Sequence, residues 1–297
     1  MELLTITGSD GYKLSAAVFR GNDAAATVQI VHGMEEHKER YFEFASFLSM
    51  NGFNVVVTDL RGHGSSAPVL SHIADRKGDE LLINDQQKVT SWIKENFPGL
   101  PLILFGHSMG TIISRVLLKT DSKEYVKAVL SGYVAPNPAG GVAVALGNTV
   151  KAFRGPKSHS KLLTTLAMGP FAKAVKERKT DLDWLSYNEE NVKEYIDDPL
   201  SGVEFSTGSY CALFSLLSGM GKTGEYRDVN ADMPILLISG IDDPCTGGEK
   251  GREASKALLE RAGFRNITVI TYEGMRHEIL HENDRDQVMG DILVFMR

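Results

Sequence analysis

The sequence predicts an α/β protein whose sheet is mostly parallel and doubly wound, with an antiparallel hairpin at its start and a mainly helical insertion. Three observations predict this class. Short apolar, β-branched runs alternate with longer helical stretches, which is typical of parallel strands joined by helical crossovers. The alternation stops between about residues 133 and 229 and then resumes. The length of 297 residues is enough for one large domain that carries such an insertion.

The first element is a hairpin, in which the runs "LLTIT" and "KLSAAVF" flank the turn "GSDGY". The parallel strands are then expected at residues 26–31, 54–59, 101–105, 127–132, 234–240 and 266–272. Because these runs are continuously apolar, we expect each strand to be buried on both faces of the sheet.

The insertion divides the predicted core, residues 1–132 and 230–297, and we expect residues 133–229 to form a cap. Its helical stretches include "VAVALGNTVKAF" and "NVKEYI". Its charge is uneven, because residues 151–179 are mainly basic and residues 181–198 are mainly acidic. Two interpretations stay open: a solvated surface, or a basic patch through which the cap makes peripheral contact with anionic lipid headgroups.

Composition argues against several classes of protein. The net charge of −6 and the pI of about 5.8 do not favour a nucleic-acid partner, since phosphate binding requires a basic surface. No apolar run approaches the ~20 residues that cross a bilayer. Cys211 and Cys245 do not make a disulfide framework, and the first residues lack the basic and then apolar pattern of a secretory leader. We therefore expect a cytoplasmic protein.

The stretch "LILFGHSMG" carries the first candidate for chemistry. Gly106, Ser108 and Gly110 form the pattern Gly-x-Ser-x-Gly between an apolar strand and a helical stretch. In such a sharp turn the serine takes an unfavourable backbone conformation, and its neighbours must lack bulk. Its Oγ then lies above a helix N-terminus, whose free N–H groups favour an oxyanion. We predict that Ser108 is a nucleophile. His107 lies within this elbow, and we assign it no chemical step.

A serine hydroxyl needs a general base, and the base needs an orienting carboxylate. One late strand is followed by Asp242 and Asp243, and the next by His277 and His281. Both loops follow the carboxyl ends of strands, where the sites of open α/β sheets gather. We predict that Asp243 and His277 are the catalytic pair, and that Asp242 and His281 are surface or supporting residues.

The stretch "QIVHGMEEH" follows an earlier strand and supplies a candidate oxyanion loop. There the N–H of Met34 can pair with the N–H of Met109 to hold an oxyanion. We interpret His32 as a residue that orders this loop, because a better placed histidine follows Ser108 in the chain.

A zinc site is the main rival interpretation of the late loop, since His277, Glu278 and His281 have the spacing His-Glu-x-x-His. Such a site needs this segment as a helix and a third ligand after it, and no histidine follows His281. We therefore predict no metal and no cofactor.

These stretches together resemble the monoglyceride lipase and lysophospholipase branch of the serine α/β-hydrolases. "HGMEEH" is similar to the family's oxyanion loop, "VVVTDLRGHGSS" to its Asp-x-Arg-Gly-His-Gly-x-Ser stretch, and "GHSMG" to its elbow. "GIDDPC" resembles the acid loop, which falls on Asp243, and "YEGMRHEILHE" the base loop, which falls on His277. The segment "DWLSYNEENVKEYIDDPLSG" is similar to the cap of bacterial members, and Cys245 stands near the place where members often have a cysteine.

The resemblance implies an α/β-hydrolase fold and a serine ester hydrolase that forms an acyl-enzyme. Its implied substrate is a small lipid ester with one acyl chain, a monoacylglycerol or a lysophospholipid, and the apolar cap suits such a chain. Other serine hydrolases of this fold, such as general carboxylesterases, thioesterases and aminopeptidase-like enzymes, carry the same triad and stay open as alternatives. A non-catalytic, ligand-binding member of the fold is a further alternative.

Overall fold

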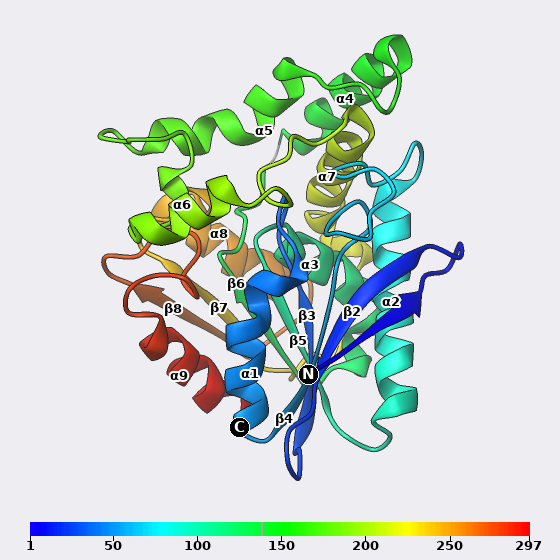
Figure 1. Cartoon of the computed structure of the whole chain (residues 1–297), viewed down its shortest axis with the longest axis vertical. Helices are drawn as coiled ribbons and strands as arrows, with labels where there is room; N and C mark the ends of the chain where they lie inside the picture. Colours follow the sequence, from blue (N-terminus) through cyan, green and yellow to red (C-terminus); the bar gives the residue numbers. More distant parts are fainter. Residues whose placement is uncertain (138) are drawn as a thin grey trace.

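The fold is built on one eight-stranded sheet with the strand order β1-β2-β4-β3-β5-β6-β7-β8 (Figure 1). It is seen in a computed structural model that describes residues 1–137 and 139–297. The β1–β2 and β2–β4 pairs are antiparallel and all later pairs are parallel. The strands are β1 (Glu2–Thr7), β2 (Lys13–Phe19), β3 (Ala26–Val31), β4 (Phe53–Thr58), β5 (Leu102–His107), β6 (Lys127–Ser131), β7 (Ile235–Gly240) and β8 (Ile267–Tyr272).

These strands confirm the predicted class, including the hairpin and the six parallel runs. One expectation was wrong, because the apolar run of β8 is not buried on both faces. Its side chains are mostly half-buried or exposed, and Val269 is 38% exposed. The cause is position: β8 is an edge strand, and within residues 1–137 and 139–297 it pairs with β7 alone.

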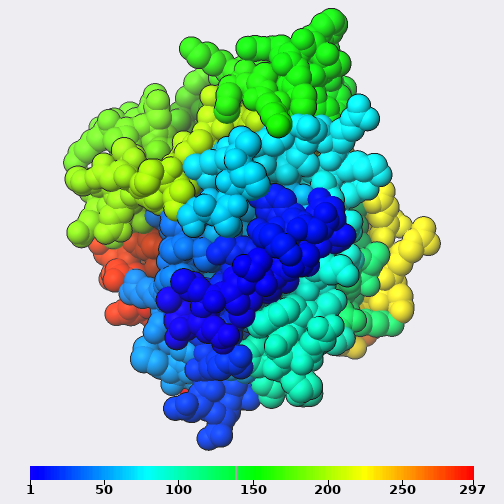
Figure 2. Space-filling view, turned by 45° about the vertical axis from the view of Figure 1, so that its right-hand side comes forward, coloured from blue at the N-terminus to red at the C-terminus, as the bar shows by residue number. Residues whose placement is uncertain are grey.

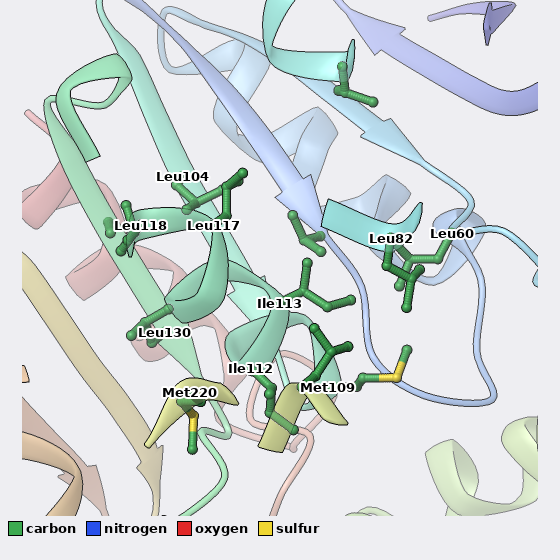
Figure 3. Packing of buried hydrophobic residues seen from close by; sticks show 14 of the residues in the cluster. Leu60, Leu82, Leu104, Met109, Ile112, Ile113, Leu117, Leu118, Leu130 and Met220 are labelled. Carbon is green, nitrogen blue, oxygen red and sulfur yellow. The ribbon is translucent and has the colours of Figure 1, made fainter. Parts of the chain in front are cut away.

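Helices cover both faces of the sheet, as a doubly wound fold requires. On one face lie α1 (Phe42–Met50) and α9 (Arg285–Met296), and on the other lie α2 (Gly78–Asn96), α3 (Met109–Asp121) and α8 (Gly248–Arg261). Side chains of β5 alternate between these two cores. Phe105 packs against Phe44 of α1, whereas Leu104 faces the core that holds Ile113 and Leu117 of α3 (Figure 3). The turn after β5, which carries Ser108, is therefore anchored on both sides.

Four further helices lie between β6 and β7 in the chain: α4 (Gly140–Arg154), α5 (Lys161–Ala174), α6 (Glu189–Asp197) and α7 (Thr207–Met220). Helix α7 packs against α2, α3 and α4. Helices α4 and α5 lie beyond one end of the sheet, and the green surface of this part of the chain projects from the body of the molecule (Figures 1 and 2). No helix among the described residues combines the length and the apolarity needed to span a membrane.

Candidate active site

Ser108 occupies the turn between β5 and α3, with φ 51° and ψ −120°. Residues other than glycine rarely adopt this region, so the turn is strained at the serine. The flanking glycines allow it. A Cβ on Gly110 would lie 2.0 Å from the carbonyl oxygen of Val31, and one on Gly106 would lie 2.7 Å from the carbonyl oxygen of Gly110. Ser108 is partly exposed whereas both of its chain neighbours are buried.

The structure brings His277 and Asp243 together, with 3.0 Å between Nδ1 and Oδ2. Asp243 begins the short 3-10 turn Pro244–Thr246, and its Oδ1 accepts a hydrogen bond from the N–H of Cys245 at 2.8 Å. Both side chains of the pair are buried. Nε2 of His277 is also buried, and it has no hydrogen-bond partner within the described part of the chain. The carboxylate therefore orients the ring through Nδ1 and leaves Nε2 available to a reacting hydroxyl.

Charge and burial act differently on the titratable groups around this pair. Burial alone would lower the pKa of His277, but the charge and hydrogen bond of Asp243, together with the neighbouring Cys245, outweigh burial and raise the pKa well above the usual range. Burial and the neighbouring His277 hold the pKa of His107 well below its usual range, so its imidazole is neutral at pH 7. Burial raises the pKa of the Cys245 thiol to about 11, and the thiol stays protonated.

The loop after β3 approaches Ser108 closely. A Cβ on Gly33 would lie 3.0 Å from Cβ of Ser108. His32 holds this loop in place, because its ring is fully buried and its Nε2 accepts a hydrogen bond from the N–H of Leu60 at 2.9 Å. In the part of the chain that the structure describes, the N–H groups of Met34 and Met109 donate no hydrogen bond to the protein. Both groups are therefore available to an acceptor in the cavity.

Sequence reasoning missed a buried ionic cluster beside the site. Arg40 contacts Glu36 of the loop after β3 (Nε to Oε2, 3.3 Å) and Glu278, next to His277 (Nη2 to Oε2, 2.7 Å). Asn191 of α6 donates to the same Glu278 oxygen at 2.6 Å. The cluster thus joins three segments that are far apart in the sequence. In the sequence, the cluster is indicated only by the charged residues of "EEHKER" and "HEIL", and charged residues are usually exposed to solvent.

The other residues considered for the late loop lie apart from the acid–base pair. Asp242 is exposed and accepts the Tyr187 hydroxyl at 3.0 Å. His281 directs a ring nitrogen to a main-chain carbonyl at 3.0 Å. Residues 277–281 form a loop, not the helix that a His-Glu-x-x-His zinc site requires.

A cavity of about 490 Å³ connects these groups. Ser108, His277, Met34 and Met109 line it on the core side, and Trp184 lines it with its ring 4.9 Å from that of His277. Most of the remaining wall is apolar and comes from α4, α5 and α7, including Val142, Ala143, Leu146, Leu166, Phe171 and Leu213. The volume and the lining suit an apolar small molecule with a polar group at one end.

Comparison with known proteins agrees with this architecture. A family model described as serine aminopeptidase, S33, matches residues 22–284. The monoacylglycerol lipase of Mycolicibacterium smegmatis is 27% identical over 274 residues, which are 91% of this chain and 87% of that protein. Phospholipase YtpA of Bacillus subtilis is 25% identical over 276 residues, 91% of this chain and 94% of that protein.

The fold has an equally clear relative among solved structures. A thermostable carboxyl esterase from Bacillus coagulans superposes with a TM-score of 0.92 at 25% identity, covering 99% of this chain and 97% of that one. The chain therefore belongs to the serine aminopeptidase S33 family of α/β-hydrolases, in the branch of the monoglyceride lipases and lysophospholipases.

Proposed function

We propose that the protein hydrolyses carboxylic esters of single-chain lipids, monoacylglycerols or lysophospholipids, with Ser108, His277 and Asp243 as its catalytic triad. The observation that carries this proposal is the buried pair of His277 and Asp243 beside a strained, partly exposed serine in one apolar cavity. The lipase and phospholipase relatives support a lipid ester. The related Bacillus coagulans esterase was solved in complex with glycerol, the alcohol part of such an ester.

The proposed reaction uses the groups of the cavity in turn. Nε2 of His277 takes the proton of Ser108 as Oγ attacks the ester carbonyl, and Asp243 stabilises the imidazolium that forms. The N–H groups of Met34 and Met109 bind the oxyanion of the tetrahedral intermediate. His277 then gives its proton to the departing alcohol oxygen, which leaves an acyl-enzyme on Ser108. Water, deprotonated by His277, attacks the acyl carbonyl, and His277 returns the proton to Oγ as the fatty acid leaves.

We also propose that residues 133–229 act as a cap over a core formed by residues 1–132 and 230–297. Support comes from α4, α5 and α7, which supply most of the apolar cavity wall. Each methylene that this wall removes from water contributes about 0.8 kcal/mol to binding. The length of the acyl chain should therefore govern kcat/KM until the cavity is filled.

A substrate panel tests the proposed function. We expect kcat/KM for 2-acylglycerols and lysophospholipids to exceed kcat/KM for amino-acid anilides, and to rise with acyl length because longer chains bury more apolar surface. Steady-state kinetics at fixed pH and salt measures this, with p-nitrophenyl acetate as the short-chain reference. Faster cleavage of anilides would favour an aminopeptidase instead, and no turnover of any ester would indicate a non-catalytic binding protein.

We further propose that the cap makes peripheral contact with anionic membrane surfaces. Helices α4 and α5 carry large apolar side chains in solvent, Val142 (71% exposed), Phe153 (87%) and Leu162 (56%). Lys157 and Lys161 are exposed between and on the same two helices. Apolar side chains next to basic ones are typical of proteins that dock on anionic lipid.

Vesicle sedimentation tests this contact. We expect binding to vesicles of phosphatidylcholine with phosphatidylglycerol to fall by about tenfold or more in a Lys157→Glu, Lys161→Glu double variant, because each lysine near such a surface contributes ~1 kcal/mol. Phe153→Ser should weaken binding as well. Lys256→Glu on α8 is the control for a change of net charge, and an equal loss in that variant would count against the cap as the docking surface.

A cytoplasmic location is proposed on the state of the cysteines. Cys211 and Cys245 are both free and buried, and unpaired thiols are usual in a reducing compartment. Cell fractionation with antibody detection tests the location.

A further inference from the structure

Glu35 differs from the other ionisable residues that line the cavity. Within the part of the chain that the structure describes, the other ionisable residues of the lining are all buried: Glu36, His107, Tyr195, Cys245, His277 and Glu278. Glu35 is partly exposed. It is therefore the acidic residue of the lining that is most open to a substrate in the cavity.

The backbone of Glu35 is held in an unfavourable conformation. Its φ is 56°, in the left-handed region that favours glycine. Its N–H donates to Nε2 of His63 at 3.3 Å, and its carbonyl oxygen accepts the Tyr195 hydroxyl and the N–H of Gly202, both at 2.8 Å. Glycine would meet this turn with less strain, so the turn does not explain why a carboxyl side chain stands here.

One carboxyl oxygen of Glu35, Oε2, has no hydrogen-bond partner among the described residues. Oε1 accepts the N–H of Phe205 at 3.1 Å, and within the described residues no salt bridge involves Glu35. Burial, reinforced by the charge of Glu204, raises the pKa of Glu35 to about 7. Near neutral pH both forms of the carboxyl are present, and a hydroxyl group suits both, because it donates to a carboxylate and accepts from a carboxylic acid.

The position of Glu35 defines which part of a substrate it meets. It follows Met34, whose N–H is one of the two proposed oxyanion donors, and both residues line the cavity. The apolar wall from α4, α5 and α7 is suited to the acyl chain, whereas the alcohol part is joined to the same carbonyl carbon and carries the polar atoms. We propose that Glu35 binds hydroxyl groups of the alcohol part and so selects esters of hydroxylated alcohols over plain alkyl esters. This inference rests on the proposed ester hydrolase function.

The experiment compares two esters that share one acyl chain, a monoacylglycerol and the propyl ester. The ratio of kcat/KM for the monoacylglycerol to kcat/KM for the propyl ester is measured in the wild type, in Glu35→Gly, in Glu35→Gln and in Glu204→Gln. A hydrogen bond to a charged group accounts for roughly a 10- to 100-fold change, so we expect the ratio to fall by that factor in Glu35→Gly. Glu204 is a nearby carboxylate that does not line the cavity, and its variant should keep the wild-type ratio.

The outcomes separate the alternatives. Glycine fits the positive φ, so Glu35→Gly should fold, and its thermal unfolding temperature checks this. Glu35→Gln keeps a hydrogen-bonding side chain of similar shape and should retain part of the preference. An equal loss on both esters would assign Glu35 to the geometry of the oxyanion loop and overturn the proposal. The choline ester of the same fatty acid is a third substrate for the wild type and Glu35→Gln; a wild-type preference for it that Glu35→Gln loses would overturn the proposal in favour of a cation site. Absence of turnover of either ester by the wild type would instead contradict the proposed function itself.

Discussion

Replacing Ser108 with alanine is expected to lower kcat for ester hydrolysis on the order of 10⁶-fold, because the acyl-enzyme then has no oxygen on which to form. KM should change little, since the cavity wall is untouched. Alanine is as strained as serine at φ 51°, so the turn gains no new penalty. Initial rates on a monoacylglycerol and the thermal unfolding temperature together measure the effect.

The matched control is Ser91→Ala on the exposed face of α2, where the serine hydroxyl donates to the carbonyl oxygen of Gln87 in the same helix. That variant should keep wild-type kcat and KM. Full esterase activity in Ser108→Ala with an unchanged unfolding temperature would contradict the assignment of the nucleophile.

Changing Asp243 to asparagine is expected to lower kcat by roughly 10⁴-fold. The side-chain oxygen of the asparagine can still accept a hydrogen bond from the N–H of Cys245. In that orientation the asparagine NH₂ group faces Nδ1 of His277. Nδ1 must then act as the acceptor and Nε2 carries the proton, so the ring cannot take the proton of Ser108. The adjacent Asp242→Asn, whose side chain is exposed and contacts Tyr187, is the control and should keep nearly full activity.

The same variant has a signature in the pH profile. His277 must be neutral to act as a base, so kcat/KM of the wild type should rise as pH increases through its raised pKa. Without the charge of Asp243, the effect of burial, which lowers that pKa, is no longer offset by the carboxylate. The inflection in Asp243→Asn should therefore move to lower pH. An unmoved inflection would mean that His277 is not the titrating base.

The sequence predicted those parts of the fold in which one physical rule acts alone. Parallel strands can be predicted because burial on both faces requires continuous apolar runs. The turn at Ser108 can be predicted because only glycine-sized neighbours fit the elbow. The prediction that β8 is buried on both faces was wrong, because apolar composition does not distinguish an edge strand from a central one. Whether a strand lies at the edge of the sheet depends on the strand order, and the strand order cannot be read from a local sequence pattern.

The remaining parts of the site depend on contacts between distant segments. Arg40, Glu278 and Asn191 form one buried cluster, yet each looks like a surface residue where it stands in the chain. Glu35 is a similar case. Its place in the stretch "HGMEEH" does not reveal that its φ is positive or that the residue lines the cavity. Such features become visible only when the sheet brings the loops together.

Ser108 is expected to be the activated nucleophile of this chain. Incubation with a fluorophosphonate probe followed by peptide mass spectrometry tests this assignment, because the probe reacts with a serine only where a base and oxyanion donors assist. We expect a single adduct on Ser108 that is absent from Ser108→Ala and strongly slowed in Asp243→Asn. An adduct on another residue, or labelling that persists in Ser108→Ala, would contradict the assignment.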